Sequence, residues 1–263
     1  MDRFHLRPQA RHWLRSPSLV GEGALALRGG EGDRDGDPGW DRWDRWVLGR
    51  MAKDELFDVG GILVDRAVLD QRFACVPQRC APGPGRGRFR SCCADLDVAL
   101  TAAEANRLRH HTHRLWPWLA RREPRLRRLP ELRDGPPFWL AQDAGHLTRP
   151  DGRCVFSALG GQGETGPRIR CHLHAYARAH EVQRQTVQPL PCRLFPLILV
   201  ELPTRGVLLT TLHRGTTRLV GSFPASRFPC LADASHPPAA RSLSRDLDWL
   251  FGPGFAHALR RCG

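Results

Sequence analysis

The feature that most constrains this chain is the placement of its cysteines. Of nine cysteines in 263 residues, seven fall between residues 75 and 192, and they stand near Arg, Gly, Pro or His rather than within long apolar runs. Reduced thiols gathered in this way are typical of metal ligands, because a cytosolic protein has little use for disulfides. The segments that carry them must then converge on one site. The seven are Cys75, Cys80, Cys92, Cys93, Cys154, Cys171 and Cys192.

The composition indicates a soluble protein of the cytoplasm. The most apolar segment, residues 194–202, contains Pro196 and Glu201 and is about half the ~20 residues that a membrane helix needs. A secretion signal is not recognisable, because the apolar stretch near the start is broken by glycine and an acidic residue. We therefore expect reduced cysteines and no membrane partner.

The formal net charge of +13 raises the question of a nucleic-acid partner. Nearly all of that charge is arginine, since Lys53 is the only lysine, and the arginines are scattered along the chain. Tyr176 is the only tyrosine, and no aromatic run resembles a platform for stacking bases. The sequence therefore does not favour nucleic acid as a partner, and a protein partner stays open.

Residues 1–50 and 51–263 differ in composition and in residue pattern. Residues 1–50 are rich in Gly, Asp and Arg and show no sustained helical or strand period, which is typical of a segment that cannot offset its ordering entropy. We interpret them as a disordered leader, or as an extension upstream of a natural start at Met51. Residues 51–263 are expected to form one irregular α+β domain around a metal site.

Four elements of that domain are predicted from pattern. A helix should begin at Thr101, where Thr101 and Glu104 form a capping box, and carry an inward stripe of Ala105, Leu108, Leu115 and Leu119. A second helix is expected from about His172 to Gln185. Residues 194–202 and 207–213 should form a β-hairpin. A last helix should follow Ser244.

The cysteine spacing suits loops that deliver soft ligands. Cys75 and Cys80 can supply two thiolates from one loop. Cys92 and Cys93 are adjacent, and adjacent side chains usually point apart, so we expect the pair to serve two atoms of a cluster, two metals, or one metal and the core. Seven or eight thiolates also exceed the four ligands of a single tetrahedral zinc.

The cysteines belong to a series of short sequence blocks. The first part is Phe73-Ala74-Cys75, Cys80 and the pair Cys92-Cys93 before a capped helix. The later blocks are Gly152-Arg153-Cys154-Val155-Phe156, Cys171-His172-Leu173-His174, Gln188-Pro189-Leu190-Pro191-Cys192-Arg193-Leu194-Phe195-Pro196 and Phe228-Pro229-Cys230-Leu231. In the order and flanks of these blocks, the chain resembles the zinc- or iron-chelating cysteine-cluster proteins over about residues 59–262.

The resemblance implies a ligand set and leaves the role open. It implies the metal ligands Cys75, Cys80, Cys92, Cys93, Cys154, Cys171 and Cys192, with Cys230 as a candidate eighth. The Pro- and Gly-rich stretch 81–91 is longer than the family's spacing and is expected to loop out.

An iron–sulfur cluster is preferred over zinc, because the cysteine pair is adjacent and Pro196 follows the last ligand. The family is distantly similar to flagellin lysine N-methylases, so an iron–sulfur-dependent protein-lysine methyltransferase is one alternative. A zinc-stabilised nucleic-acid or protein adaptor is another. The sequence does not decide whether the protein is an enzyme.

Other polar groups near the thiols have secondary roles. Four arginines, at positions 90, 153, 170 and 193, are expected to offset thiolate charge. His172 and His174 are candidates for second-shell donors or alternative ligands. The sequence Gly161-Gln162-Gly163-Glu164-Thr165-Gly166 matches a dinucleotide motif literally, but its context predicts a loop.

Overall fold

The computed structural model describes residues 3–7, 39–80, 90–95, 98, 100–123, 126, 145–163, 166–202, 205–220 and 224–262. The chain divides into two compact units, one formed by Met1–Cys75 with Arg193–Gly263 and the other by Val76–Cys192. Both combine helices with β-strands, which confirms the expected α+β class. The expected single domain of residues 51–263 thus becomes two units, and the first is built from segments that are distant in sequence.

The first unit is organised by a four-stranded sheet in the order β1-β2-β6-β5. Strands β2 and β6 run parallel, and the other two pairs are antiparallel. The hairpin β5–β6 confirms the hairpin expected from sequence, with Leu199 opposite Leu209. Burial is nearly continuous along β5 and over the last four residues of β6, so both faces of these strands are covered, which explains why this segment has the highest apolar content of the chain. The strands are β1 (Leu56–Val59), β2 (Ile62–Asp65), β5 (Leu197–Leu202) and β6 (Gly206–Thr211).

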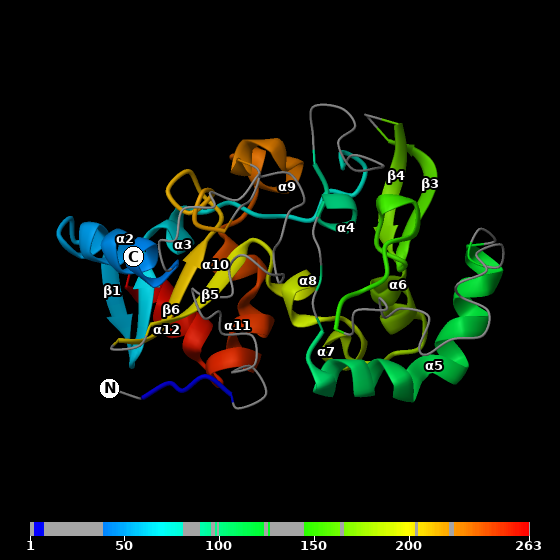
Figure 1. The fold of residues 1–263 in the computed structure, drawn as a ribbon, viewed down its shortest axis with the longest axis horizontal. Helices are drawn as coiled ribbons and strands as arrows, with labels where there is room; N and C mark the ends of the chain where they lie inside the picture. Colours follow the sequence, from blue (N-terminus) through cyan, green and yellow to red (C-terminus); the bar gives the residue numbers. More distant parts are fainter. Residues whose placement is uncertain are drawn as a thin grey trace. The chain divides into compact units, whose positions relative to one another are not determined.

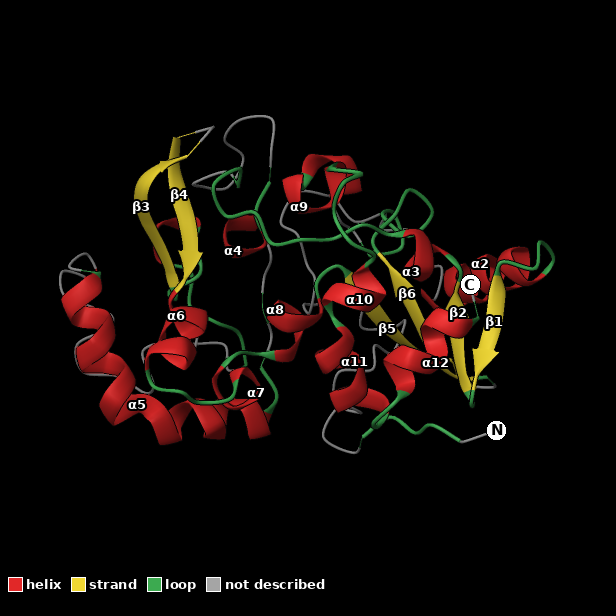
Figure 2. Cartoon of the chain, turned by 180° about the vertical axis from the view of Figure 1, so that it is seen from behind, coloured by secondary structure: helices red, strands yellow, loops and turns green. Residues whose placement is uncertain are grey.

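Helices complete the first unit. Three of them, α10 (Ala239–Ser242), α11 (Ser244–Phe251) and α12 (Phe255–Arg261), pack on one another and cover the face of the sheet turned to the viewer in Figure 2. The predicted last helix is α11, with Leu247 and Leu250 fully buried. The remaining elements are α2 (Gly39–Met51), α3 (Ala67–Asp70), η5 (Ala225–Arg227) and α9 (Pro229–Ala232).

The N-terminal residues that the structure describes belong to this unit. Helix α2 crosses the expected boundary at residue 50, and its Trp43 and Val47 are buried. Phe4 donates its N–H to the carbonyl of Gly60 and packs edge-on against the ring of Phe255. These parts of residues 1–50 are therefore ordered, because apolar side chains within the polar leader find partners in the sheet unit. Residues 8–38 lie outside the described residues.

The second unit is built around the long helix α5 (Ala102–Arg122). In Figure 1 the hairpin β3–β4 stands beside α4, while α6 and α7 lie against α5. The chain passes into the first unit within α8. The elements are α4 (Cys92–Asp95), η4 (Pro150–Gly152), β3 (Ser157–Gly163), β4 (Gly166–Cys171), α6 (His172–Ala179), α7 (Arg184–Val187) and α8 (Leu190–Leu194).

Helix α5 confirms its predicted start. The side chain of Thr101 accepts the N–H of Glu104, and the Glu104 carboxylate accepts the N–H of Thr101, so the capping box is closed. The predicted inward stripe is buried. The helix continues through Pro117 and ends at Arg122, so this proline does not terminate it.

Two expectations for this unit are wrong. The helix expected from His172 to Gln185 stops at Ala179, because Glu181 takes a left-handed conformation with φ of 54° and reverses the chain before α7. The described residues of the glycine motif, 161–163 and 166, are not a loop but belong to the paired strands β3 and β4. A hairpin lacks the strand-to-helix turn that holds a dinucleotide phosphate. The sequence pattern at 138–147 also predicts a strand and turn, but this segment lies mostly outside the described residues, and residues 81–89 lie wholly outside them.

Candidate metal centre

Six of the predicted ligands lie in the second unit, and five of these six come from four separate segments. Cys92 and Cys93 form the start of α4, and Cys154 follows η4. Cys171 ends β4 and caps α6, and Cys192 lies in α8. We call Cys92, Cys93, Cys154, Cys171 and Cys192 the five-thiol cluster.

Backbone hydrogen bonds bring three of these segments together. The N–H of Cys154 donates to the carbonyl of Cys93 over 2.9 Å, which joins the turn after η4 to α4. Ser157 is the register partner of Cys171 across the β3–β4 pair. The N–H of His172 donates to the carbonyl of Phe156 over 2.8 Å and secures the end of β4. These main-chain contacts hold the segments of Cys93, Cys154 and Cys171 beside one another.

The vicinal pair differs from the sequence-based expectation. The Sγ atoms of Cys92 and Cys93 lie 4.0 Å apart and contact each other, so the two side chains do not point apart. Two sulfurs bound to one tetrahedral zinc at about 2.3 Å would lie roughly 3.8 Å apart. The helical turn of α4 therefore gives the pair a separation that suits one metal ion or two atoms of one cluster.

The two thiols of the pair titrate in opposite directions. The hydrogen bond from Cys93 lowers the pKa of Cys92, and this effect outweighs burial, which raises it. The same hydrogen bond raises the pKa of Cys93 well above its ordinary value, and burial and the negative charges of Cys92, Cys171 and Cys154 add to the rise. Cys92 is thus the first of the pair to become a thiolate, which is the form that binds metal.

The pKa values of the other three thiols are raised, mainly by burial and in addition by neighbouring thiolates. Burial and the charge of Cys171 raise the pKa of Cys154 to about 12. Burial also raises the pKa of Cys171, with the charge of Cys92 adding to it. The pKa of Cys192 is raised well above its ordinary value by burial and by the charges of Cys154, Cys171 and Cys92. Each sulfur is therefore within electrostatic reach of several others, which places Cys192 with the rest of the cluster.

Two arginines that the sequence did not suggest act on the cluster, and one that it did suggest is paired elsewhere. Arg149 lowers the pKa of Cys154, and Arg184 lowers that of Cys171, where the N–H groups of Leu173 and His174 at the start of α6 act in the same direction. Arg193, expected to face the thiols, is buried in an ion pair with Asp246. Sequence analysis missed Arg149 and Arg184 because neither adjoins a cysteine.

The donor set fits a thiophilic metal, although the side chains are not arranged around one. Among the described residues, no three His, Cys, Asp or Glu side chains lie in a geometry that could hold a metal ion. Cys92, Cys93, Cys171 and Cys192 are partly exposed, while their thiols lie in surroundings dense enough for burial to raise most of their pKa values. Ligation would thus require the cysteine side chains to move from the positions that they have in this structure.

The other three predicted ligands are placed differently. Cys80 belongs to the second unit, and its thiol contacts the carbonyl of Val76 over 3.5 Å. Cys75 and Cys230 belong to the first unit, where the N–H of Ala74 donates to the carbonyl of Cys230. Cys75 is exposed and Cys230 is buried. The contacts described above thus link five of the eight predicted ligands, and the role of Cys75, Cys80 and Cys230 as ligands stays a prediction.

The two histidines beside Cys171 differ from each other. His172 is buried, its ring packs edge-on against Trp118 at 5.4 Å, and its Nε2 lies 3.5 Å from the carboxylate of Glu123. His174 is exposed, and partial burial together with Arg184 and Arg178 lowers its pKa. His172 therefore fixes the end of β4 on α5, which is the supporting role that the sequence offered as one alternative.

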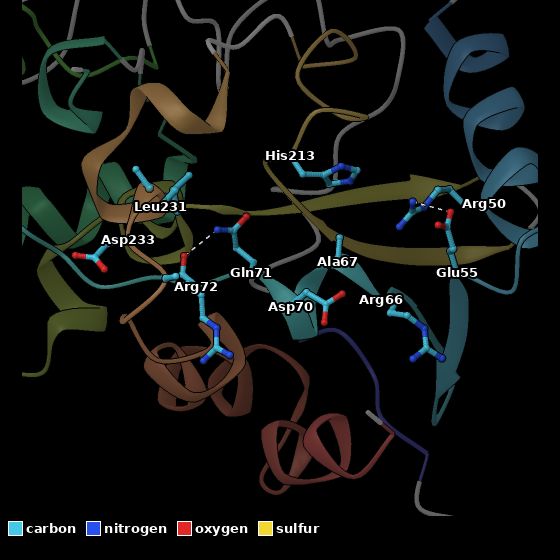
Figure 3. Close-up of a pocket in the computed structure, with 12 residues that line it drawn as sticks. Arg50, Glu55, Arg66, Ala67, Asp70, Gln71, Arg72, His213, Leu231 and Asp233 are labelled. Atoms are coloured by element: carbon cyan, nitrogen blue, oxygen red, sulfur yellow. Dashed lines mark hydrogen bonds and ion pairs between the residues drawn. The ribbon is translucent and has the colours of Figure 1, made fainter. Parts of the chain in front are cut away.

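The first unit holds a separate cavity of about 520 Å³. Figure 3 shows Arg50, Glu55 and His213 at one end and Leu231 and Asp233 at the other. Arg50 forms an ion pair with Glu55, so opposite charges within the lining compensate one another. No sequence motif pointed to this cavity.

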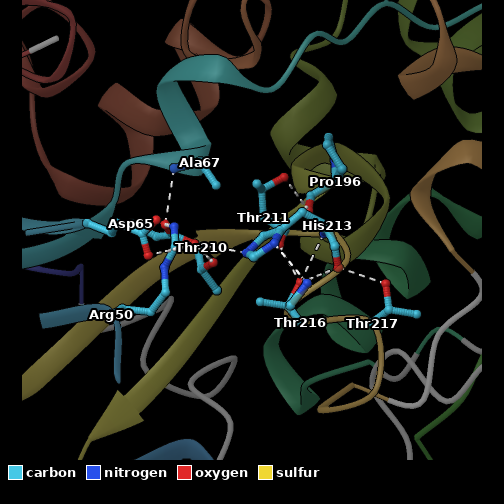
Figure 4. A network of polar contacts seen from close by, with 11 residues as sticks. Arg50, Asp65, Ala67, Pro196, Thr210, Thr211, His213, Thr216 and Thr217 are labelled. Carbon is cyan, nitrogen blue, oxygen red and sulfur yellow. Dashed lines mark hydrogen bonds and ion pairs between the residues drawn. The ribbon is translucent and has the colours of Figure 1, made fainter. Parts of the chain in front are cut away.

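A polar network centred on Asp65 lies beside that cavity (Figure 4). The fully buried Asp65 carboxylate accepts hydrogen bonds from Thr210, from the N–H of Ala67 and from Arg50, and its Oδ2 lies 3.1 Å from Nε2 of His213. The other ring nitrogen, Nδ1 of His213, accepts the N–H of Gly215 over 3.0 Å. Because both ring nitrogens are engaged, this arrangement serves structure and leaves no lone pair to act as a base.

The fold and the five-thiol cluster together define an α+β protein with a candidate thiolate metal centre. No family model, no curated protein and no solved structure matches the chain. No helix in the part of the chain that the structure describes combines the length and apolar character needed to cross a bilayer. The argument for function therefore depends on the residues of the cluster.

Proposed function

We propose that this protein binds a metal ion or an iron–sulfur cluster through thiolates of the five-thiol cluster. The observation that carries the proposal is the convergence of five cysteines from four segments that are up to 100 residues apart in sequence. Buried structural cysteines occur singly in apolar cores. Four of these thiols have raised pKa values, so turning them into thiolates costs free energy that a bound cation would offset.

An iron–sulfur cluster is the preferred occupant and zinc is the alternative. Adjacent cysteines and a proline shortly after the last ligand are typical of cluster ligation. Bound metal would neutralise the negative charge of the thiolates and would cross-link α4, β4 and α8. The chain's own residues hold those elements close, and Arg149 and Arg184 lower the cost of forming thiolates.

Anaerobic purification followed by metal and acid-labile sulfide analysis tests the proposal. We expect iron and sulfide in similar amounts, with a visible absorption band that is lost on oxidation. Zinc without sulfide would support the metal site and refute the preferred occupant. Protein that takes up neither zinc nor iron with sulfide, even after reconstitution, would refute the proposal.

Cysteine variants locate the site. Cys154→Ala and Cys171→Ala should each lower metal content at least tenfold, because each removes a thiol from the cluster. The matched control is Cys262→Ala, since Cys262 is an exposed thiol that contacts only the first unit through the carbonyl of Ala258. Cys75→Ala, Cys80→Ala and Cys230→Ala then show whether the remaining predicted ligands take part.

A further inference from the structure

A buried glutamate on α5 reaches the segment that carries Cys192. Glu104 is only 3% exposed, although it lies in the first turn of a helix whose polar face is open to solvent. One carboxylate oxygen, Oε2, closes the capping box by accepting from the N–H of Thr101 over 3.2 Å. The other oxygen, Oε1, accepts the N–H of Leu190 over 2.8 Å. Capping requires only the first of these bonds, so the second has a different consequence.

The bonded amide has a special place in the sequence. Leu190 begins α8 and precedes Cys192 by two residues, between Pro189 and Pro191. Proline has no N–H, so Leu190 supplies the single main-chain donor between Gln188 and Cys192. The Leu190 N–H is therefore the one backbone donor of residues 189–191 that a side chain can bind, and the Glu104 carboxylate binds it.

The far end of the same segment is also attached to α5. His172, next to Cys171, contacts Trp118 and Glu123 in the last turns of the helix. The segment from Cys171 to Cys192 is thus tied to α5 at both ends, through Glu123 and Glu104. A single rigid helix sets the separation of these two cysteines.

We infer that Glu104 is a positioning residue for Cys192, holding its thiol within the five-thiol cluster through the hydrogen bond to Leu190. The inference rests on the proposed function for its metal consequence. The placement of Cys192 itself can be measured without metal. A carboxylate at this position has two acceptor oxygens, and both are used.

The test compares three substitutions at residue 104 with one at residue 101. Glu104→Ala removes both bonds, and Glu104→Asp keeps the charge but shortens the reach to Leu190. Glu104→Gln retains one acceptor for Leu190. Thr101→Ala weakens the cap of the same helix and leaves the bond to Leu190, so it is the matched control.

Two measurements are made on each full-length variant. The first is the rate at which a thiol reagent alkylates Cys192 in metal-free protein, read by peptide mass spectrometry with the exposed Cys262 as internal reference. The second is the rate at which a chelator removes metal from loaded protein. We expect Glu104→Ala and Glu104→Asp to raise both rates at least tenfold, and Glu104→Gln and Thr101→Ala to change them less than threefold.

The outcomes separate the inference from the proposed function. Equal changes in Glu104→Ala and Thr101→Ala would overturn the inference, because helix capping alone would then explain them. If Glu104→Ala does not fold, Glu104→Asp decides the matter by the same comparison. If the unaltered protein binds no metal, the proposed function fails, and the alkylation contrast still decides whether Glu104 places Cys192.

Discussion

Asp65 is the residue at which the most buried polar interactions of the first unit meet. Burial by itself raises the pKa of its carboxyl, but the hydrogen bonds from His213, Thr210, Ala67 and Arg50 outweigh burial and lower that pKa. A carboxylate whose pKa is lower in the folded state stabilises the fold above the unfolded pKa, and this contribution is lost as pH falls through the folded pKa.

We predict that Asp65→Asn lowers the free energy of unfolding at pH 7 by about 2–4 kcal/mol, since an amide cannot accept from all four donors. The difference in unfolding free energy between Asp65→Asn and the unaltered protein should shrink as the pH falls below about 4, the pKa of an aspartate in the unfolded chain, and towards the lower folded pKa. Urea unfolding at pH 7 and pH 3 measures both values. A difference that does not change with pH would show that the ionised form is not the stabilising one.

Arg193, which follows Cys192 in the sequence motif, has a structural role in the first unit. Its guanidinium is buried, pairs with Asp246 and lies 4.7 Å from the ring centroid of Trp249. Removing one partner of a buried ion pair leaves an uncompensated charge, whereas removing both does not.

Asp246→Ala should therefore lower the free energy of unfolding by about 3–5 kcal/mol. The double variant Arg193→Met with Asp246→Leu should recover most of this loss, because it replaces the pair with apolar side chains. Chemical denaturation of the single and double variants provides the comparison. A double variant that is less stable than Asp246→Ala would contradict the account.

At the scale of elements, the end of α6 shows how a single residue divides a predicted helix. Helical pattern continues past Ala179, yet Glu181 adopts φ of 54° and α7 begins only at Arg184. A non-glycine residue pays about 1–2 kcal/mol for this conformation. This turn at Glu181 reverses the chain, and α7 then leads into α8, which carries Leu190 and Cys192.

Glu181→Gly should raise the free energy of unfolding by about 0.5–1 kcal/mol, since glycine adopts positive φ without strain. The matched control is Ala179→Gly, which makes a glycine at the last helical position and should lower stability by a similar amount. Thermal unfolding of both variants gives opposite signs if the turn is as described. Destabilisation by both would show that the Glu181 side chain matters more than its backbone.

At the scale of the whole molecule, the candidate site and the sheet belong to different units. The five-thiol cluster lies within Val76–Cys192, while the sheet is built from segments on both sides of it. The free energy of metal binding stabilises the part of the fold that carries the ligands. Its effect should therefore be local.

Removal of metal by a chelator should increase amide hydrogen exchange at least tenfold in α4, β3, β4 and α8. Exchange in β2, β5 and β6 should change less than twofold, because these strands are held by their own hydrogen bonds and apolar core. Hydrogen-exchange mass spectrometry of the loaded and chelated protein measures both regions. Equal loss of protection in both would show that the two units unfold together.

Local chemistry made part of the structure predictable. The capping box at Thr101 and Glu104, the β5–β6 hairpin and the helix after Ser244 follow from patterns within a dozen residues. The adjacent cysteines could not be oriented in this way, because the expectation for neighbouring side chains assumes extended backbone and α4 is helical. Helix α2 does not follow from local pattern, because it is stabilised by packing on β1 and by the contact of Trp46 with His213.

The amino-acid sequence by itself determined the α+β class, the main local elements and the candidate thiols, since these depend on residue type and short-range spacing. Only the tertiary structure decided which thiols influence one another, that Arg193 pairs with Asp246, and that Glu104 reaches Leu190. These contacts join residues dozens of positions apart. Their free energy depends on how the chain closes on itself, which no local pattern encodes.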